Sequence, residues 1–278
     1  MKTIRIDYPP TSLVRWGPDS GYPAGMMKMF AAHEDTHRAF IRMLSGYEAD
    51  FRAIPTLTDD DTLPRWQQSW FFPLDGMSSY ALVADRKPGQ LIEIGSGNST
   101  KFFAHARRNH APDMVLHSID PFPRAEINGL CDHIHRIGLE AVDLSLFDRL
   151  EPGDMVFFDG SHRAFQNSDV TVFFLDVLPR LAPGITVGIH DVFLPRDYPE
   201  DWIPKYYNEQ YMLGAYMVPF GTRFPLVAAC HYVHKFMADA LKEAFSPDLI
   251  ACFPEKIAQR VPARINGSCF WFETRQLT

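Results

Sequence analysis

Short apolar runs alternate with segments of helical periodicity from residue 90 onward, and this alternation restricts the fold more than any other feature of the sequence. It is typical of βαβ units and therefore of a mostly parallel sheet. The helical segments between the runs are expected, for example, at Ser99 to Asn109 and at Asp169 to Leu181. The strands are expected at Gln90 to Ile94, Val115 to Ile119, Leu139 to Val142, Asp154 to Phe158 and Ile185 to Ile189.

The segment before the alternating region has a different pattern. Apolar residues recur at helical spacing from Ala24 to Ala53, and another helix is expected at Ser78 to Asp85. We therefore predict an N-terminal helical cap at residues 1–87, followed by a Rossmann-like, doubly wound α/β domain at residues 88–278.

The segment after the fifth expected strand completes the predicted sheet. An insertion rich in proline, tyrosine and tryptophan occupies residues 193–216. Two strand-like runs follow at Leu226 to Val233 and Ser268 to Glu273, with a helix near Met237 to Phe245 between them. These runs bring the expected number of strands to seven.

Composition excludes several classes of protein. The net charge of -7 argues against a nucleic-acid-binding protein, because phosphate binding requires a clustered basic surface. The four cysteines are widely spaced without a C-x-x-C pair, which predicts reduced thiols rather than a zinc ribbon or a disulfide framework. Residues Met1 to Pro10 lack an apolar segment, and no run approaches 18 apolar residues. We expect a cytoplasmic protein that does not associate with membranes.

A glycine-rich turn follows the first expected strand, in the run Glu93 to Thr100. Such a turn lets backbone amides approach a ligand, and the helix after it supplies partial positive charge. A Walker A phosphate loop is excluded, because Gly97 is followed by Asn-Ser-Thr-Lys rather than by the required spacing. The dinucleotide fingerprint is weakened but stays open, because Thr100 stands where its third glycine would be.

The same run, E-x-G-x-G-x-S-T, resembles motif I of class I S-adenosylmethionine (SAM)-dependent methyltransferases. The chain is similar to small-molecule O-methyltransferases of methyltransferase family 24, from Leu91 to the last strand, whereas residues 1–87 match poorly. The resemblance implies that the last two strands form an antiparallel hairpin at the sheet edge. It also implies that the loop holds SAM through Glu93, Gly95, Ser96, Gly97, Asn98 and Ser99.

Acids at the ends of successive strands extend this implied cofactor site. Asp120 follows the second strand and is expected to accept the ribose hydroxyls, as the acid of a dinucleotide fold does. Asp143 follows the third expected strand as the partner of the adenine amino group, and Asp159 follows the fourth. Taken singly, each acid is better explained as a solvated loop carboxylate or a helix cap, and it is their joint placement at successive strand ends that favours a cofactor site.

The fourth and fifth strands end in Asp159-Gly-Ser-His162 and in His190-Asp191, which resembles metal-dependent O-methyltransferases. The resemblance implies a divalent metal on Asp159, His190 and Asp191, with His162 as the base that takes a hydroxyl proton. His190 replaces the usual oxygen ligand, and an imidazole shifts the preference from magnesium toward manganese, iron or zinc, so the identity of the metal stays open. The alternative is that both histidines bond to neighbouring backbone and that Asp191 caps a turn.

Two further motifs bear on substrate and activity. Tyr198, Trp202 and Tyr206 in the insertion present flat faces suited to a sugar or aromatic acceptor, or else pack the insertion onto the domain or a second subunit. The run His33 to His37 satisfies the zinc-protease pattern H-E-x-x-H, but no continuation supplies a third ligand. A surface helix with a chance match is the favoured interpretation of that run.

The expected function is therefore transfer of the methyl group of SAM to an oxygen of a small molecule such as a sugar or natural product. A homodimer is the default expectation for the assembly. Two alternatives stay open at this point. One is a non-methylating enzyme on the same fold, such as a hydroxylase-like enzyme or a cyclase, and the other is a SAM-binding regulatory or scaffold subunit.

Overall fold

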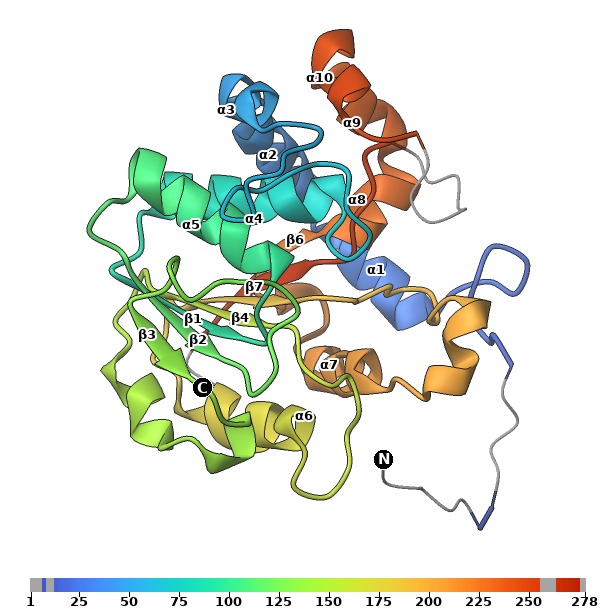
Figure 1. Cartoon of the computed structure of the whole chain (residues 1–278). Helices are drawn as coiled ribbons and strands as arrows, with labels where there is room; N and C mark the ends of the chain where they lie inside the picture. The colour runs from blue at the N-terminus through green and yellow to red at the C-terminus, as the bar shows by residue number, and fades with distance from the viewer. Residues whose placement is uncertain (1–6, 9–12, 256–263, 276–278) are drawn as a thin grey trace.

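The computed structural model describes residues 7–8, 13–255 and 264–275, which form a central sheet covered by helices on both faces (Figure 1). The sheet has seven strands in the order β3-β2-β1-β4-β5-β7-β6. Strands β1 to β5 run parallel, whereas β7 is antiparallel to both of its neighbours. The strands are β1 (Gln90–Ile94), β2 (Val115–Ile119), β3 (His133–His135), β4 (Met155–Phe158), β5 (Thr186–Ile189), β6 (Leu226–Ala229) and β7 (Phe270–Glu273). The predicted Rossmann-like class is confirmed. The residues Met1 to Pro10, for which we noted the lack of an apolar segment, lie mostly outside the described residues.

Helices α4 and α5 pack together on one face of the sheet, and α6 lies on the opposite face (Figure 1). Helix α6 continues as a π-helical turn over Phe173–Val177. The helices are α1 (Ala24–Ala32), α2 (Glu34–Ser45), α3 (Glu48–Ala53), α4 (Pro73–Arg86), α5 (Asn98–His110), α6 (Asp169–Val172), α7 (Glu209–Met217), α8 (Cys230–Phe236), α9 (Ala238–Glu243) and α10 (Pro247–Cys252). No helix among these described elements is long and apolar enough to cross a membrane.

The N-terminal helices pack onto the last part of the chain as well as onto the sheet. Helix α2 contacts β6, α4 and α9, and α3 contacts α10. The buried apolar side chains form one continuous cluster that runs from α1 to β7. The boundary predicted at residue 87 stays a prediction.

The register of the parallel strands brings their carboxyl ends to one level. Ile94 of β1 pairs with Ile119 of β2 and with Phe158 of β4, which in turn pairs with Ile189 of β5. The residues that follow these strands therefore emerge side by side at one edge. In doubly wound sheets this edge is where ligands bind.

Three expected elements differ in the structure. The predicted strand at Leu139 to Val142 is wrong: a 3₁₀ helix occupies Leu139–Ala141, and the third strand is the polar edge strand β3. An edge strand has one open side, so it needs no apolar run and gives no periodic signal. The predicted helix from Ala24 to Ala53 divides into α1, α2 and α3. The apolar run from Leu226 is a strand only to Ala229, after which α8 begins.

Candidate active site

The two glycines of the loop after β1 have different roles. Gly95 has a φ of 78°, and a Cβ atom there would lie 1.9 Å from the backbone oxygen of Asp159. Only glycine fits, because the ends of β1 and β4 approach each other at this point. Gly97 has extended backbone, and the nearest atom to a Cβ there would be the Cβ of Arg124 at 3.8 Å. The missing side chain of Gly97 therefore leaves open space above the loop.

Glu93 stabilises the glycine loop through hydrogen bonds to the helix that follows it. Its two carboxyl oxygens accept hydrogen bonds from Ser99 Oγ at 2.5 Å and Thr100 Oγ1 at 2.6 Å, which tie the first turn of α5 to β1. Burial raises the pKa of Glu93 to about 8, although the two hydroxyl groups oppose this shift. The carboxyl does not line the adjacent cavity. The expected direct contact of Glu93 with a cofactor is thus replaced by support of the loop.

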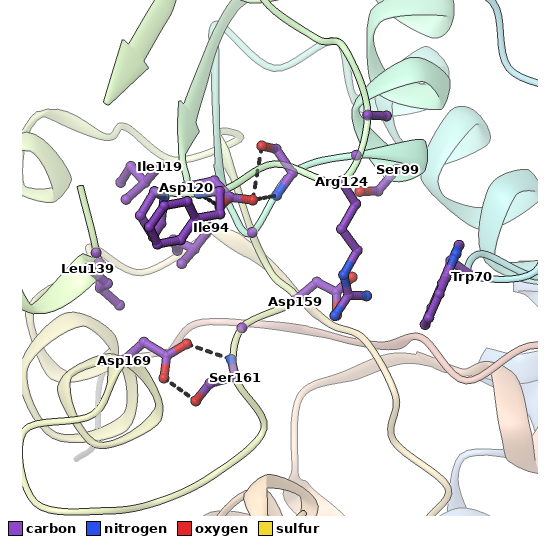
Figure 2. A pocket seen from close by; sticks show the side chains of 18 of the residues that line it. Trp70, Ile94, Ser99, Ile119, Asp120, Arg124, Leu139, Asp159, Ser161 and Asp169 are labelled. Atoms are coloured by element: carbon purple, nitrogen blue, oxygen red, sulfur yellow. Dashed lines mark hydrogen bonds between the residues drawn. The ribbon is translucent and has the colours of Figure 1, made fainter. Parts of the chain in front are cut away.

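A cavity of about 450 Å³ opens above the loop (Figure 2). Its wall includes the expected loop residues Gly95, Ser96, Gly97, Asn98 and Ser99. Asp120 also lines it, and one of its oxygens accepts from the Ser96 backbone N–H at 2.7 Å while the other accepts from the Phe122 N–H at 2.7 Å. The acid after β2 therefore ties the glycine loop to the next turn.

Asp143 is not in this cavity. Its carboxylate accepts a hydrogen bond of 3.0 Å from the Ser145 N–H and so caps the 3₁₀ helix at Leu144–Arg149. Leu139 and Glu140 line the cavity in its place. The expectation for Asp143 was wrong in position because the third strand ends earlier, at His135, and the chain turns before it reaches Asp143.

A second cavity of about 940 Å³ lies beside the first. Trp70, Arg124 and Asp159 line both cavities, and the Arg124 guanidinium lies 4.7 Å from the centre of the Trp70 ring. Of the expected acceptor residues, Tyr198 and Trp202 line the second cavity. Tyr206 is 46% exposed and does not line it.

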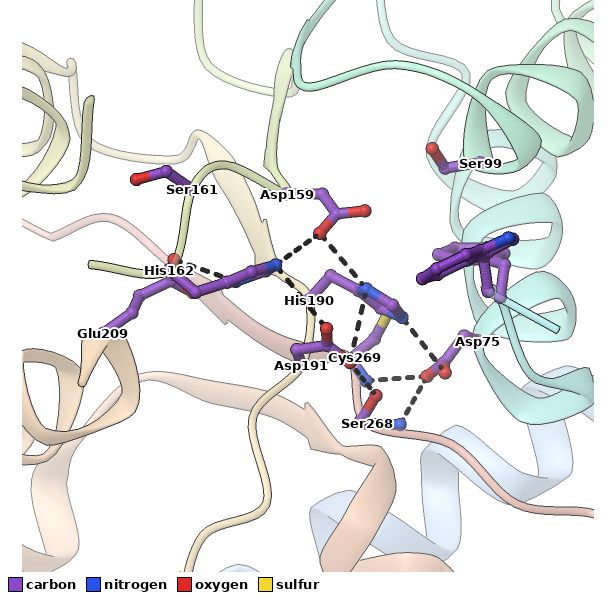
Figure 3. A network of polar contacts seen from close by, with 12 residues as sticks. Asp75, Ser99, Asp159, Ser161, His162, His190, Asp191, Glu209, Ser268 and Cys269 are labelled. Atoms are coloured by element: carbon purple, nitrogen blue, oxygen red, sulfur yellow. Dashed lines mark hydrogen bonds and ion pairs between the residues drawn. The ribbon is translucent and has the colours of Figure 1, made fainter. Parts of the chain in front are cut away.

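Two histidines and two aspartates converge on the wall of the second cavity (Figure 3). Asp159 Oδ1 lies 3.4 Å from His162 Nε2 and 3.4 Å from His190 Nδ1. Asp191 places its two oxygens 3.5 Å from His162 Nε2 and 3.7 Å from His190 Nδ1. The strand ends thus bring together the three expected metal residues, and His162 joins them. We call these four residues the His/Asp cluster.

Each histidine of the His/Asp cluster is backed by a buried acid on its far side. His162 Nδ1 lies 3.4 Å from Glu209 Oε2 on α7, and His190 Nε2 lies 3.5 Å from Asp75 Oδ2 on α4. The other oxygen of Asp75 accepts the backbone N–H groups of Ser268 and Cys269. Both acids are fully buried. A sequence offers little sign of such long-range partners, except that Asp75 is an acid within the apolar first part of α4.

Residues 92–192 match the family model of a methyltransferase domain. That segment carries the end of β1, the glycine loop, Asp120 and all four residues of the His/Asp cluster. Residues 92–192 thus resemble a methyltransferase domain, and the match spans less than half of the chain. No protein of curated function matches the sequence.

Two solved structures are similar to this chain over most of its length. The O-methyltransferase from Bacillus cereus in complex with SAH is 16% identical, with a TM-score of 0.42, and the match covers 84% of this chain and 100% of that one. The O-methyltransferase TomG from Streptomyces achromogenes, in complex with SAM, is 18% identical with a TM-score of 0.41, over 83% and 96% of the two chains.

Strong electrostatic interactions shift the pKa values within the His/Asp cluster. Burial opposes charge on His162, but Glu209, Asp191 and Asp159 outweigh it and raise the pKa of His162 to about 9. The pKa of His190 is likewise raised well above its usual value, because Asp191 and Asp159 outweigh its burial. Burial disfavours the charged form of Asp159 too, yet His190 and His162 lower its pKa to about 2.

Backbone strain is concentrated at the same place. His162 and Asp191 have φ angles of 61° and 55°, in the left-handed region that residues with a Cβ rarely adopt. Such conformations persist where the surrounding structure enforces them, and they gather at functional sites. The strain observed at two of the four cluster residues supports a functional role for the cluster.

The zinc-protease pattern at His33 to His37 is not a metal site in the structure. Both ring nitrogens of His33 bond to backbone carbonyls, of Met29 and Phe224, each at 2.8 Å. His37 Nε2 faces the backbone N–H of Ala229 at 3.4 Å. Within the described residues, neither histidine belongs to a group of side chains that could share a metal ion. The structure favours a chance match.

Proposed function

We propose that this chain transfers the methyl group of SAM to an oxygen of a small molecule. The observation that carries the proposal is the junction of the two cavities at Trp70, Arg124 and Asp159. One cavity has a glycine loop as its floor, and the other has the His/Asp cluster in its wall. Holding a donor and an acceptor in two adjoining cavities supplies the proximity on which group transfer depends.

The residues that line the first cavity are suited to binding SAM. The open space above Gly97 admits a ligand against backbone, and no lysine follows the loop in the position that a triphosphate requires. Asp120 stands after β2, where an acid can accept ribose hydroxyls. In bound form SAM supplies an activated methyl group on a sulfonium. Gly95, Ser96, Gly97, Asn98, Ser99, Asp120 and Asp159 are the residues proposed to surround it.

The His/Asp cluster fits a divalent metal. Two donors about 2.1 Å from one metal lie about 3.0 to 3.4 Å apart in octahedral or tetrahedral geometry, close to the 3.4 to 3.7 Å found between donors here. Buried His190 Nδ1 has no hydrogen-bond partner. The proposed ligands are Asp159, His162 and Asp191, whose donor atoms all lie within 4.8 Å of one another. His190 is proposed as the fourth, because its Nδ1 lies 3.4 Å from Asp159 and 3.7 Å from Asp191. Two imidazoles favour a transition metal over magnesium. A cation there would orient an acceptor hydroxyl and lower its pKa.

His162 serves in this proposal as a ligand rather than as the base expected from the sequence. Its Nε2 faces Asp159 and Asp191, and its Nδ1 faces Glu209. The side chain is almost fully buried yet lines the second cavity, and its Nε2 lies beside the two carboxylates that would share the metal. The buried acids Glu209 and Asp75 orient the two imidazoles, as carboxylates behind metal-bound histidines commonly do.

Radiolabel transfer tests the proposal. The full chain is incubated with methyl-labelled SAM and a panel of hydroxylated small molecules, with manganese, zinc, magnesium or a chelator. Metal-dependent labelling of an acceptor is expected, and Asp191→Asn is expected to abolish it. SAM binding without transfer to any acceptor under any metal would overturn the proposal and favour a regulatory subunit. Asp148→Asn, on the exposed 3₁₀ helix at Leu144–Arg149, is the matched control and should keep full transfer.

A further inference from the structure

A cluster of basic side chains lies in the second cavity and has no role in the chemistry proposed above. It consists of Arg196, from the insertion after β5, and His231, His234 and Lys235 on α8. The three residues of α8 lie on one face, because positions three and four apart are neighbours on a helix. We call these four residues the basic cluster.

The two cations of the basic cluster have no ion-pair partner among the described residues. Within residues 7–8, 13–255 and 264–275, the side chains of Arg196 and Lys235 make no hydrogen bond or ion pair. Burial and the nearby Arg196 lower the pKa of Lys235, with no acid among the causes. Asp197 is the acid next in sequence, but its oxygens already accept the Trp16 N–H and the Tyr211 hydroxyl. Acids such as Asp19 and Glu200 line the same cavity, but none forms an ion pair with either cation within the described part of the chain.

The two histidines add unsatisfied polar atoms to the same wall. His231 is 6% exposed and His234 is 8% exposed, and His231 Nε2 and His234 Nδ1 are buried without a hydrogen-bond partner. Burial, Lys235 and Arg196 lower the pKa of His234 to about 3, so its imidazole is neutral. Buried polar atoms are nearly always paired in folded proteins. Those of the basic cluster are arranged to pair with a ligand.

We propose that the basic cluster binds an oxyanion, a carboxylate or a phosphate, carried by the methyl acceptor. This inference rests on the proposed function, because the basic cluster and the His/Asp cluster line the same cavity. A guanidinium recognises both kinds of oxyanion through paired N–H groups. The cavity, at about 940 Å³, is near the upper end of small-molecule sites and can hold a molecule that spans both clusters. The acceptor is thus a hydroxylated acid, with its anionic group on Arg196 and Lys235.

Anion binding to the full chain without SAM tests this assignment independently of methyl transfer. Inorganic phosphate and acetate are titrated separately by calorimetry or by chemical-shift perturbation, and the anion that binds more tightly identifies the class. The double variant Arg196→Gln/Lys235→Met should weaken binding at least tenfold. Lys242→Met, an exposed lysine of α9 outside both cavities, should bind as the wild-type chain does. Arg196→Lys, which keeps the positive charge, should retain measurable anion binding. This variant separates loss of the charge from disruption of the fold by substitution at position 196.

Equal anion affinity in the wild-type chain and the double variant would overturn the inference, as would the absence of any binding to the wild-type chain. Once an acceptor is known, the double variant should raise its KM at least tenfold while the Kd for SAM stays unchanged. A chain that binds phosphate or acetate through the basic cluster but fails to bind SAM would contradict the proposed function alone. The two failures are therefore distinguishable.

Discussion

Replacing Gly95 by alanine should lower the free energy of unfolding more than the same change at Gly97. The φ of 78° at Gly95 costs a residue with a Cβ roughly 1 to 2 kcal/mol. In addition, the new methyl carbon would lie 1.9 Å from a backbone oxygen of Asp159, which no rotamer change can move away. We expect a total loss of roughly 3 kcal/mol, or a fall in Tm on the order of 10 °C. Urea and thermal unfolding of the full chain measure it.

Gly97→Ala is the matched control for this prediction. Its backbone is extended and its Cβ would have 3.8 Å of clearance, so the free energy of unfolding should change by less than about 1 kcal/mol. The affinity for SAM should nevertheless fall, because the methyl group fills space above the loop. Equal stability of Gly95→Ala and Gly97→Ala would refute the distinction between a structural and a ligand-facing glycine.

Three further predictions concern the acids. Glu93→Gln should flatten the pH dependence of the free energy of unfolding. The Glu93 carboxyl, whose pKa is raised to about 8, stabilises the fold at low pH and loses this contribution as the pH rises from about 5 to 8. Urea unfolding of the variant and the wild-type chain across that pH range measures the difference. Asp120→Asn should weaken SAM binding at least tenfold and Asp143→Asn less than twofold, in calorimetric titrations; equal effects would contradict their different positions. Glu209→Gln should weaken binding of manganese or zinc by about 10- to 100-fold in competition with a chelating dye, and an unchanged affinity would remove its proposed role behind His162.

The sequence predicts the central strands well because these strands are buried on both faces. The bounds of β1 and β2 are those expected, and β4 and β5 differ by one residue at their starts. The polar edge strand β3 was missed, and with it the position of Asp143. Hydrophobic periodicity reveals a strand only when its side chains are buried. Strand β3 lies at the sheet edge and two of its three residues are histidines, so its sequence shows no apolar pattern.

The candidate site shows the same division. Asp120, Asp159, His190 and Asp191 could be located because each directly follows a predicted strand, and parallel strands end at one edge. Glu209 and the basic cluster could not be located from the sequence. They lie in the insertion and on α8, and the apolar run after Leu226 led us to predict a strand where α8 begins. Contacts between segments distant in sequence are set by tertiary packing and leave no local pattern.

Calorimetric titration of the full chain with SAM tests the central claim most directly. The account predicts saturable binding with a Kd in the micromolar range, weakened at least tenfold in Asp120→Asn and nearly unchanged in Asp143→Asn. The absence of binding at millimolar SAM, with and without divalent metal, would contradict the assignment of the glycine-loop cavity and the methyl transfer built on it.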